Sequence, residues 1–159
     1  MLARGLVKWF DTTLIETPGR APANKANAAR GPNILETIDE PGGAARAAEM
    51  LAEARKRDPQ ATLFPEAIVN QLGYEHLAAG DKQGAIAIFK LNVTAFPDSA
   101  NTYDSLADAY VADGQTELAI ENAEKTLKVL EADSKTTEQQ RKLIREAAEQ
   151  KLKQLRRGE

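Results

Sequence analysis

Apolar and small residues recur in the middle of the chain at a constant spacing of 34 positions. The recurring positions are Leu72-Gly73, Gly80 and Ala85-Ile86, and then Leu106-Ala107, Gly114 and Ala119-Ile120. A period of this length is typical of helix–turn–helix units that stack on neighbours of the same kind. The pattern therefore predicts two successive helical hairpins.

Within the first copy, helical periodicity separates two amphipathic segments. Leu72, His76 and Ala79 share one face of the first segment, which ends at Gly80. The second segment stops near Pro97, and its inner face consists of Ala85, Ile88, Phe89 and Asn92.

Shorter patterns flank these hairpins. Residues 32–59 contain a short apolar segment, a break at 39–43 and an Ala-rich helical stretch, as expected for a degenerate first hairpin. Residues 136–157 predict a terminal capping helix with a narrow apolar stripe between charged faces. The start of this helix fits a capping box, formed either by Thr136 with Gln139 or by Thr137 with Gln140.

The N-terminal part differs from the rest. Residues 2–16 form an amphipathic pattern, and residues 20–31 lack periodicity and are expected to be a linker. The expected organisation is an N-terminal helix and linker over 1–31 and a repeat domain over 32–159. The repeat domain would comprise a degenerate repeat at 32–59, repeats at 65–97 and 99–131, and the capping helix at 136–157.

Composition narrows the range of functions. The net charge is −3, so global basicity does not favour nucleic acid as a partner. Residues 65–133 carry 12 acids and 4 bases, a net of −8, whereas residues 134–159 carry 8 bases and 4 acids, a net of +4. Cysteine is absent, and no apolar run has the length of a membrane helix. No contact with nucleic acid or membrane is expected.

Catalytic chemistry has little support in the residues. His76 is the single histidine, and we expect it to be a packed, hydrogen-bonded ring. Ser105 and Asp104 are adjacent on one predicted helix and point in different directions, so they do not form a triad with His76. Cysteine ligands, clustered histidines and glycine-rich phosphate loops are missing. We therefore expect no enzyme activity, no metal site and no cofactor.

The repeated pattern resembles the tetratricopeptide repeat over residues 65–131, on Leu72-Gly73, Ala85, Phe89, Pro97 and Tyr110. The resemblance implies an all-α, right-handed array of helix-turn-helix pairs whose leading helices line a concave groove. The groove positions carried over to this chain are Ala67, Asn70, Tyr74 and Leu77, then Asn101, Asp104, Asp108 and Val111. It implies a protein or peptide as the partner.

The residues of this groove and the net charge of −8 predict an extended, polar and cationic ligand. The basic terminal helix is one such ligand within the chain, either folded back or docked on a neighbouring molecule. Asp104 and Asp108 are expected to be exposed. An ordinary solvated helix face is the open alternative for these two carboxylates.

A second resemblance is to the helical tail that follows bacterial serine hydrolases, including penicillin-binding-like peptidases and α/β-hydrolases. It is carried by residues 70–74, 85–92 and 96–106, and by a seam from Trp9 to Pro22. The resemblance implies a non-catalytic accessory or scaffold module, because Ser-x-x-Lys and Gly-x-Ser-x-Gly are both absent. The compartment would be the cytoplasm for a free-standing protein and the cell envelope for a piece of a secreted hydrolase.

The alternative function is self-association. The stripe in residues 2–16 would expose a large apolar patch on an isolated helix, which monomers avoid. Leu6, Trp9 and Phe10 would then form a homodimer interface, and the protein would bind no foreign peptide.

Overall fold

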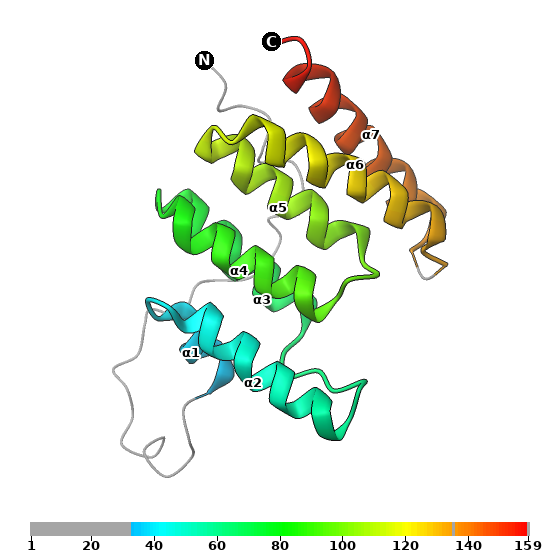
Figure 1. Ribbon diagram of the computed structural model, residues 1–159. Coiled ribbons are helices and arrows are strands. Elements are labelled where there is room, and N and C mark those ends of the chain that lie inside the picture. Colours follow the sequence, from blue (N-terminus) through cyan, green and yellow to red (C-terminus); the bar gives the residue numbers. More distant parts are fainter. Residues whose placement is uncertain (1–32, 135, 159) are drawn as a thin grey trace, which may run out of the picture. The chain divides into compact units, whose positions relative to one another are not determined.

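A computed structural model describes residues 33–134 and 136–158, and the regular structure of this part of the chain is entirely α-helical (Figure 1). The described helices are α1 (Ile34–Asp39), α2 (Gly43–Arg57), α3 (Glu66–Ala78), α4 (Lys82–Ala95), α5 (Ala100–Asp113), α6 (Thr116–Ala132) and α7 (Glu138–Leu155). All seven belong to the unit Pro32–Glu159. The all-α prediction is confirmed, and the helix expected over 2–16 lies outside the described residues.

Consecutive helices pack in pairs along the chain (Figure 1). α1 packs on α2, α3 on α4 and α5 on α6, while α7 packs mainly on α6 and also touches α5. The pairs are joined by contacts of α2 with α4, of α4 with α5 and of α3 with α5. Each helix thus buries its apolar stripe on its neighbours, an arrangement consistent with a helical array.

The turns after α3 and α5 have the same construction. Gly80 and Gly114 adopt φ values of 84° and 76°, in the left-handed region. In both turns the next residue closes the helix, because Asp81 N–H donates to the His76 carbonyl and Gln115 N–H to the Tyr110 carbonyl, each at 2.9 Å. A Cβ atom at either glycine would meet no atom within 4 Å, so the backbone conformation alone requires glycine.

The pairing of α3 with α4 depends on a close approach at Gly73. A Cβ atom at this position would lie 2.5 Å from the Phe89 ring, which is itself fully buried. The next residue, Tyr74, packs edge-on against the same ring with 5.0 Å between centroids. Gly73 therefore lets Phe89 fill the space between the two helices.

An arginine that the sequence patterns did not single out joins α2 to the end of α4. The Arg55 guanidinium donates to the carbonyls of Thr94 at 2.9 Å and Ala95 at 2.7 Å, and to that of Ala61 at 3.3 Å. Carbonyls in the last turn of a helix lack partners within the helix, so Arg55 satisfies two of them. The first helical pair is in this way attached to the second by polar as well as apolar contacts.

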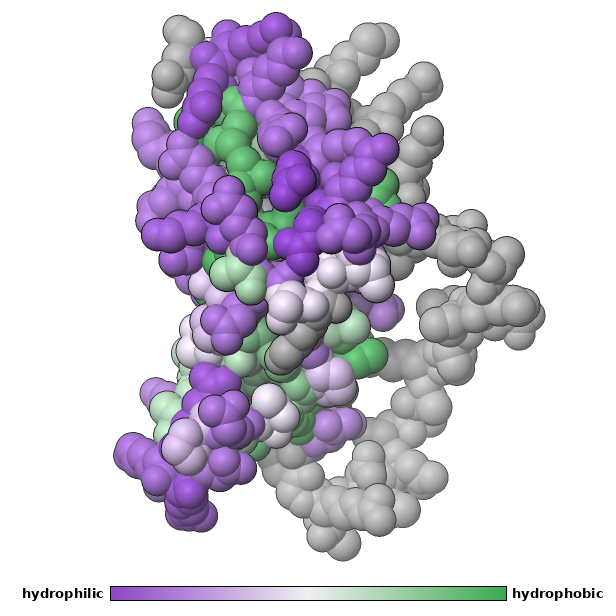
Figure 2. Space-filling model, turned by 90° about the vertical axis from the view of Figure 1, so that its right-hand side faces the viewer, coloured by the Kyte–Doolittle hydropathy of each residue, from purple (hydrophilic) through white to green (hydrophobic). Residues whose placement is uncertain are grey.

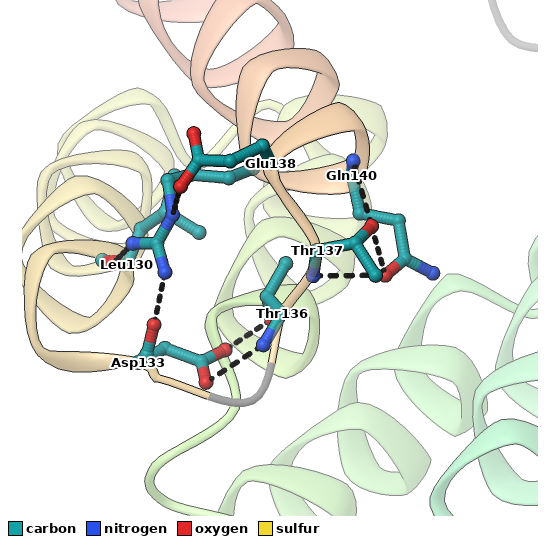
Figure 3. A network of polar contacts seen from close by, with 7 residues as sticks. Leu130, Asp133, Thr136, Thr137, Glu138 and Gln140 are labelled. Carbon is teal, nitrogen blue, oxygen red and sulfur yellow. Dashed lines mark hydrogen bonds and ion pairs between the residues drawn. The ribbon is translucent and has the colours of Figure 1, made fainter.

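The connection from α6 to α7 is held by two polar arrangements (Figure 3). The first is a capping box, in which Thr137 Oγ1 accepts from Gln140 N–H and Gln140 Oε1 accepts from Thr137 N–H, each at 3.3 Å. Of the two boxes that the sequence allowed, this is the one formed. The second is the Arg141 guanidinium, which donates to the carbonyls of Leu130 and Asp133 at the end of α6.

Tyr110 provides a test of the packing. Only 4% of this residue is exposed, and it belongs to the apolar cluster that contains Phe89 and Leu106. Tyr110→Ala is expected to lower the free energy of unfolding by about 3–5 kcal/mol, as truncation of a large buried aromatic does. Urea denaturation followed by circular dichroism measures this loss. Tyr103→Ala, at a partly exposed position on the same helix, is the control and should cost clearly less.

Candidate functional site

The ammonium of Lys151, on α7, lies between two carboxylates of α5. Its Nζ atom is 2.8 Å from Asp104 Oδ1 and 2.6 Å from Asp108 Oδ1. It also donates to the backbone carbonyl of Asp104 at 3.0 Å. A lysine ammonium has three donors, and here three acceptors surround it. The two acids are one turn apart on α5, which is the spacing that lets both reach the same cation.

Tyr74, on α3, completes this cluster from the other side. Its hydroxyl donates to Asp108 Oδ2 at 2.9 Å and lies 3.2 Å from Ser105 Oγ. Burial, the charge of Asp108 and other local effects raise the pKa of Tyr74 well above 10.0, so the phenol stays protonated and can donate. Three helices thus contribute to one polar site, which we call the ammonium site: Tyr74, Asp104, Ser105, Asp108 and Lys151.

One cation shared by two carboxylates leaves the site with a net negative charge. Burial of Lys151 would lower its pKa, but the charges of Asp104 and Asp108 outweigh burial and raise the pKa above 10.5. The pKa of Asp104 lies above 3.8, because burial and the charge of Asp108 outweigh the attraction of Lys151. The site is therefore suited to a permanent cation and would repel an anion.

The other predicted groove residues have different surroundings. Asn101 donates through its side-chain amide to Glu66 Oε1 at 3.1 Å, and Leu77 packs at the edge of the apolar cluster around Phe89. The side-chain oxygen of Asn70 is buried and has no hydrogen-bond partner among the described residues. Of the eight predicted groove residues, three are brought together at the ammonium site: Tyr74, Asp104 and Asp108. The other five are not part of that cluster: Ala67, Asn70, Leu77, Asn101 and Val111.

The expectation that Asp104 and Asp108 are exposed is wrong. Their side chains are 18% and 17% exposed, because α7 lies against α5 and Lys151 covers both carboxylates. Of the two arrangements that we considered for the basic terminal helix, the structure has the one in which it folds back on its own chain.

Lys151 was recognised from the sequence only as one of the basic residues near the end of the terminal helix, not as a contact of Asp104 and Asp108. Lys151 lies three residues after Ala148 and seven after Ile144, and this spacing puts it on the side of α7 that carries the apolar stripe. A cation at such a position was the available signal for a charge partner on the neighbouring helix. Figure 2 views the molecule from the right-hand side of Figure 1 and shows hydrophilic residues over most of its upper part, with a strip of hydrophobic residues between them.

His76 lies apart from the ammonium site and is hydrogen-bonded, as predicted. Its ring contacts Asp81 and Asp39, whereas Ser105 contacts Tyr74. The described residues therefore contain no Ser105–His76–Asp104 triad. Among those same residues, no cluster of three or more histidine, aspartate or glutamate side chains could hold a metal ion.

Comparison with known protein families finds no family that matches the chain, and comparison with curated proteins finds no similar sequence. None of the helices in the described part of the chain is long and apolar enough to cross a membrane.

The contribution of Lys151 to stability can be measured directly. Lys151→Ala leaves two largely buried carboxylates without their cation and is expected to lower the free energy of unfolding by about 2–4 kcal/mol. Lys153→Ala removes an exposed charge from the same helix and should stay within about 0.5 kcal/mol of the parent. Urea denaturation at neutral pH compares the two.

The pH dependence of this loss separates charge from packing. Without Lys151, the repulsion between Asp104 and Asp108 raises the pKa of Asp104 further. Asp104 of the variant therefore takes up its proton at a higher pH than Asp104 of the parent, and this protonation removes the repulsion. The cost of Lys151→Ala should therefore shrink as the pH falls through the carboxyl range. A cost that is the same at pH 4 and pH 7 would mean that the lysine acts through packing alone.

Proposed function

We propose that this protein is a non-catalytic protein-binding module, and that the ammonium site is where it holds a lysine of an extended, cationic partner segment. The observation that carries the proposal is the coordination of Lys151 by Asp104 and Asp108 at 2.8 and 2.6 Å. This geometry matches a primary ammonium, which presents three donors from one compact charge.

The helical architecture supports the same role. The α3–α4 and α5–α6 pairs have the same turn at Gly80 and Gly114, at the 34-residue spacing. We take these pairs to be tetratricopeptide-type repeats of a right-handed array, in which α3 and α5 are the leading helices. Tyr74, Asp104 and Asp108 then occupy the groove positions that this family uses for peptides.

In the isolated chain Lys151 occupies the site, so a partner lysine would have to replace it. The exchange swaps one ammonium for another in the same set of acceptors, and the electrostatic gain from the exchange itself is small. Additional contacts would have to supply the affinity. Val111 is 44% exposed at the groove position one turn beyond Asp108, and it offers an apolar contact to an extended segment.

The enzyme beside which this module would act is suggested by the second sequence resemblance. Residues 70–74, 85–92 and 96–106 resemble the helical tails of bacterial serine hydrolases. We therefore propose an accessory or scaffold role next to a hydrolase, with the reaction carried out by the enzyme.

Binding can be tested with a fluorescein-labelled peptide of alternating lysine and serine, by fluorescence anisotropy with the full chain. The same peptide with every lysine acetylated keeps the length but loses the charge, and it should not bind. Affinity should fall as the salt concentration rises past about 0.15 M, where the Debye length is about 8 Å. Lys151→Gln removes the competing ammonium and should tighten binding.

Asp104→Asn with Asp108→Asn is expected to weaken this binding about tenfold, or about 1.4 kcal/mol. The matched control is Glu117→Gln with Glu121→Gln, which removes two exposed charges from α6. If both double variants bind the peptide equally weakly, the peptide is attracted by the net charge of the protein and not by the ammonium site. Unchanged affinity in the aspartate variant would exclude the ammonium site as the binding site.

Self-association is a second proposal, carried by the apolar stripe of Leu6, Trp9 and Phe10, which lie outside the described residues. Light scattering over a range of concentrations distinguishes it. A monomer at all concentrations would contradict it without affecting the peptide experiment.

A further inference from the structure

The single histidine of the chain lies between two carboxylates that come from different helices. His76, in the last turn of α3, places Nδ1 2.8 Å from Asp81 Oδ2 and Nε2 3.1 Å from Asp39 Oδ1. Asp81 precedes α4, and Asp39 is the last residue of α1. The His76 side chain is 20% exposed, whereas each carboxylate is about half exposed.

The geometry specifies the protonation state of the ring. An ionised carboxylate only accepts hydrogen bonds, and a neutral imidazole has one N–H and one acceptor nitrogen. Both His76 nitrogens face carboxylate oxygens, so both contacts are hydrogen bonds only when the ring is an imidazolium. The C-terminal end of α3, where the ring lies, also favours a positive charge.

Asp81 and Asp39 differ in the other interactions that hold each carboxylate near His76. Asp81 caps α4, since its Oδ1 atom accepts from Gly84 N–H at 2.9 Å, and the five-residue turn keeps it beside His76 whatever the charge of the ring. A Cβ atom at residue 84 would lie 2.0 Å from Asp81 Oδ2 and 2.8 Å from His76 Nδ1, so glycine leaves room for this pair. Asp39 has no comparable local restraint. The remaining proton of a neutral ring would stay on Nδ1, and the contact with Asp39 would be lost.

α1 packs mainly on α2 and has few contacts with α3 and α4. It consists of six residues, a length at which a helix has little stability of its own. Ile38 is 1% exposed and is buried in an apolar cluster with Leu51, Val69 and Ile88. The contact of His76 with Asp39 adds a polar interaction to the burial of Ile38 in holding α1.

We propose that Asp39, His76 and Asp81 form a proton-operated clasp, which fastens α1 to α3 while the imidazole is protonated and loosens α1 when the proton is lost. Loosening would uncover part of the apolar cluster to which Ile38 belongs. This device shares no residue with the ammonium site, although helix α3 contributes to both.

The sign of the pH dependence follows from the surrounding charges. Burial of the ring lowers the pKa of His76, but hydrogen bonds to Asp81 and Asp39 and their charges outweigh burial, so the pKa lies above 6.5. The same contact lowers the pKa of Asp81. The cation nearest in sequence to Asp39, Arg46 of α2, is paired with Glu40 at 2.6 Å. The clasp therefore contributes stability below pH 6.5, and this contribution is lost as the pH rises through the folded pKa of His76.

Proton NMR of the imidazole tests the clasp without assignment ambiguity, because the chain has one histidine. In the full chain the His76 pKa should lie above 6.5, and Asp39→Asn should shift it downward. Glu40→Gln changes the neighbouring residue by the same charge and is the control, expected to leave the His76 pKa nearly unchanged. A parent pKa at or below 6.5, or equal shifts in the two variants, would overturn the proposal.

Hydrogen exchange tests the release of α1. After correction for intrinsic exchange, protection of the Thr37 and Glu40 amides should fall as the pH rises through the His76 titration. In Asp39→Asn, the protection of these two amides should be low both below and above the pKa of His76. The Asp133 amide at the end of α6 should keep its protection over the whole pH range. Constant α1 protection across the titration would overturn the clasp even if the pKa is raised, since the ion pair would then not control α1.

Discussion

The close approach of α3 and α4 at Gly73 positions the Tyr74 side chain of the ammonium site. Because residue 73 has no side chain, the Phe89 ring fills the space between the two helices, and Tyr74 packs edge-on against that ring. This packing directs the Tyr74 hydroxyl to Asp108 at 2.9 Å. Asp108, together with Asp104, then holds Lys151 of α7. A steric condition at one glycine is thereby transmitted through one aromatic contact to the position of the terminal helix.

The fold class could be predicted because its determinants are local. Gly80 and Gly114 are required by their positive φ values, and such a requirement is visible in the sequence as two glycines 34 positions apart. The capping box of α7 was likewise visible, although the sequence allowed two registers and the structure uses Thr137 with Gln140. Arg55 could not be found in this way, because its acceptors at Thr94 and Ala95 lie 39 and 40 residues further along the chain.

The candidate site was predicted in part. A family pattern placed Tyr74, Asp104 and Asp108 on one surface. In the structure Asp104 and Asp108 both contact Lys151, and Tyr74 contacts Asp108. Their exposure was wrong, because position within a repeat says nothing about where a following helix will pack. Asn101 is predicted to contact a ligand, and in the structure its side-chain amide donates to Glu66 Oε1 of α3 at 3.1 Å. Pairings of this kind depend on the relative rotation of two helices, which periodicity alone does not determine.

The uneven distribution of charge along the chain corresponds to ion pairs between its acidic and basic parts. The acidic residues 65–133 and the basic residues 134–159 meet where Lys151 binds α5 and where Arg156 pairs with Glu124 at 2.5 Å. These two contacts differ in their environment. Arg156 and Glu124 are each more than half exposed, so water and salt weaken their attraction, whereas Lys151 is 12% exposed and far less screened. Moderate salt would therefore loosen the end of α7 before it loosens the ammonium site. In the proposed exchange, a partner lysine would have to displace the better protected of the two contacts, so the proposal requires complementary shape beyond the charge.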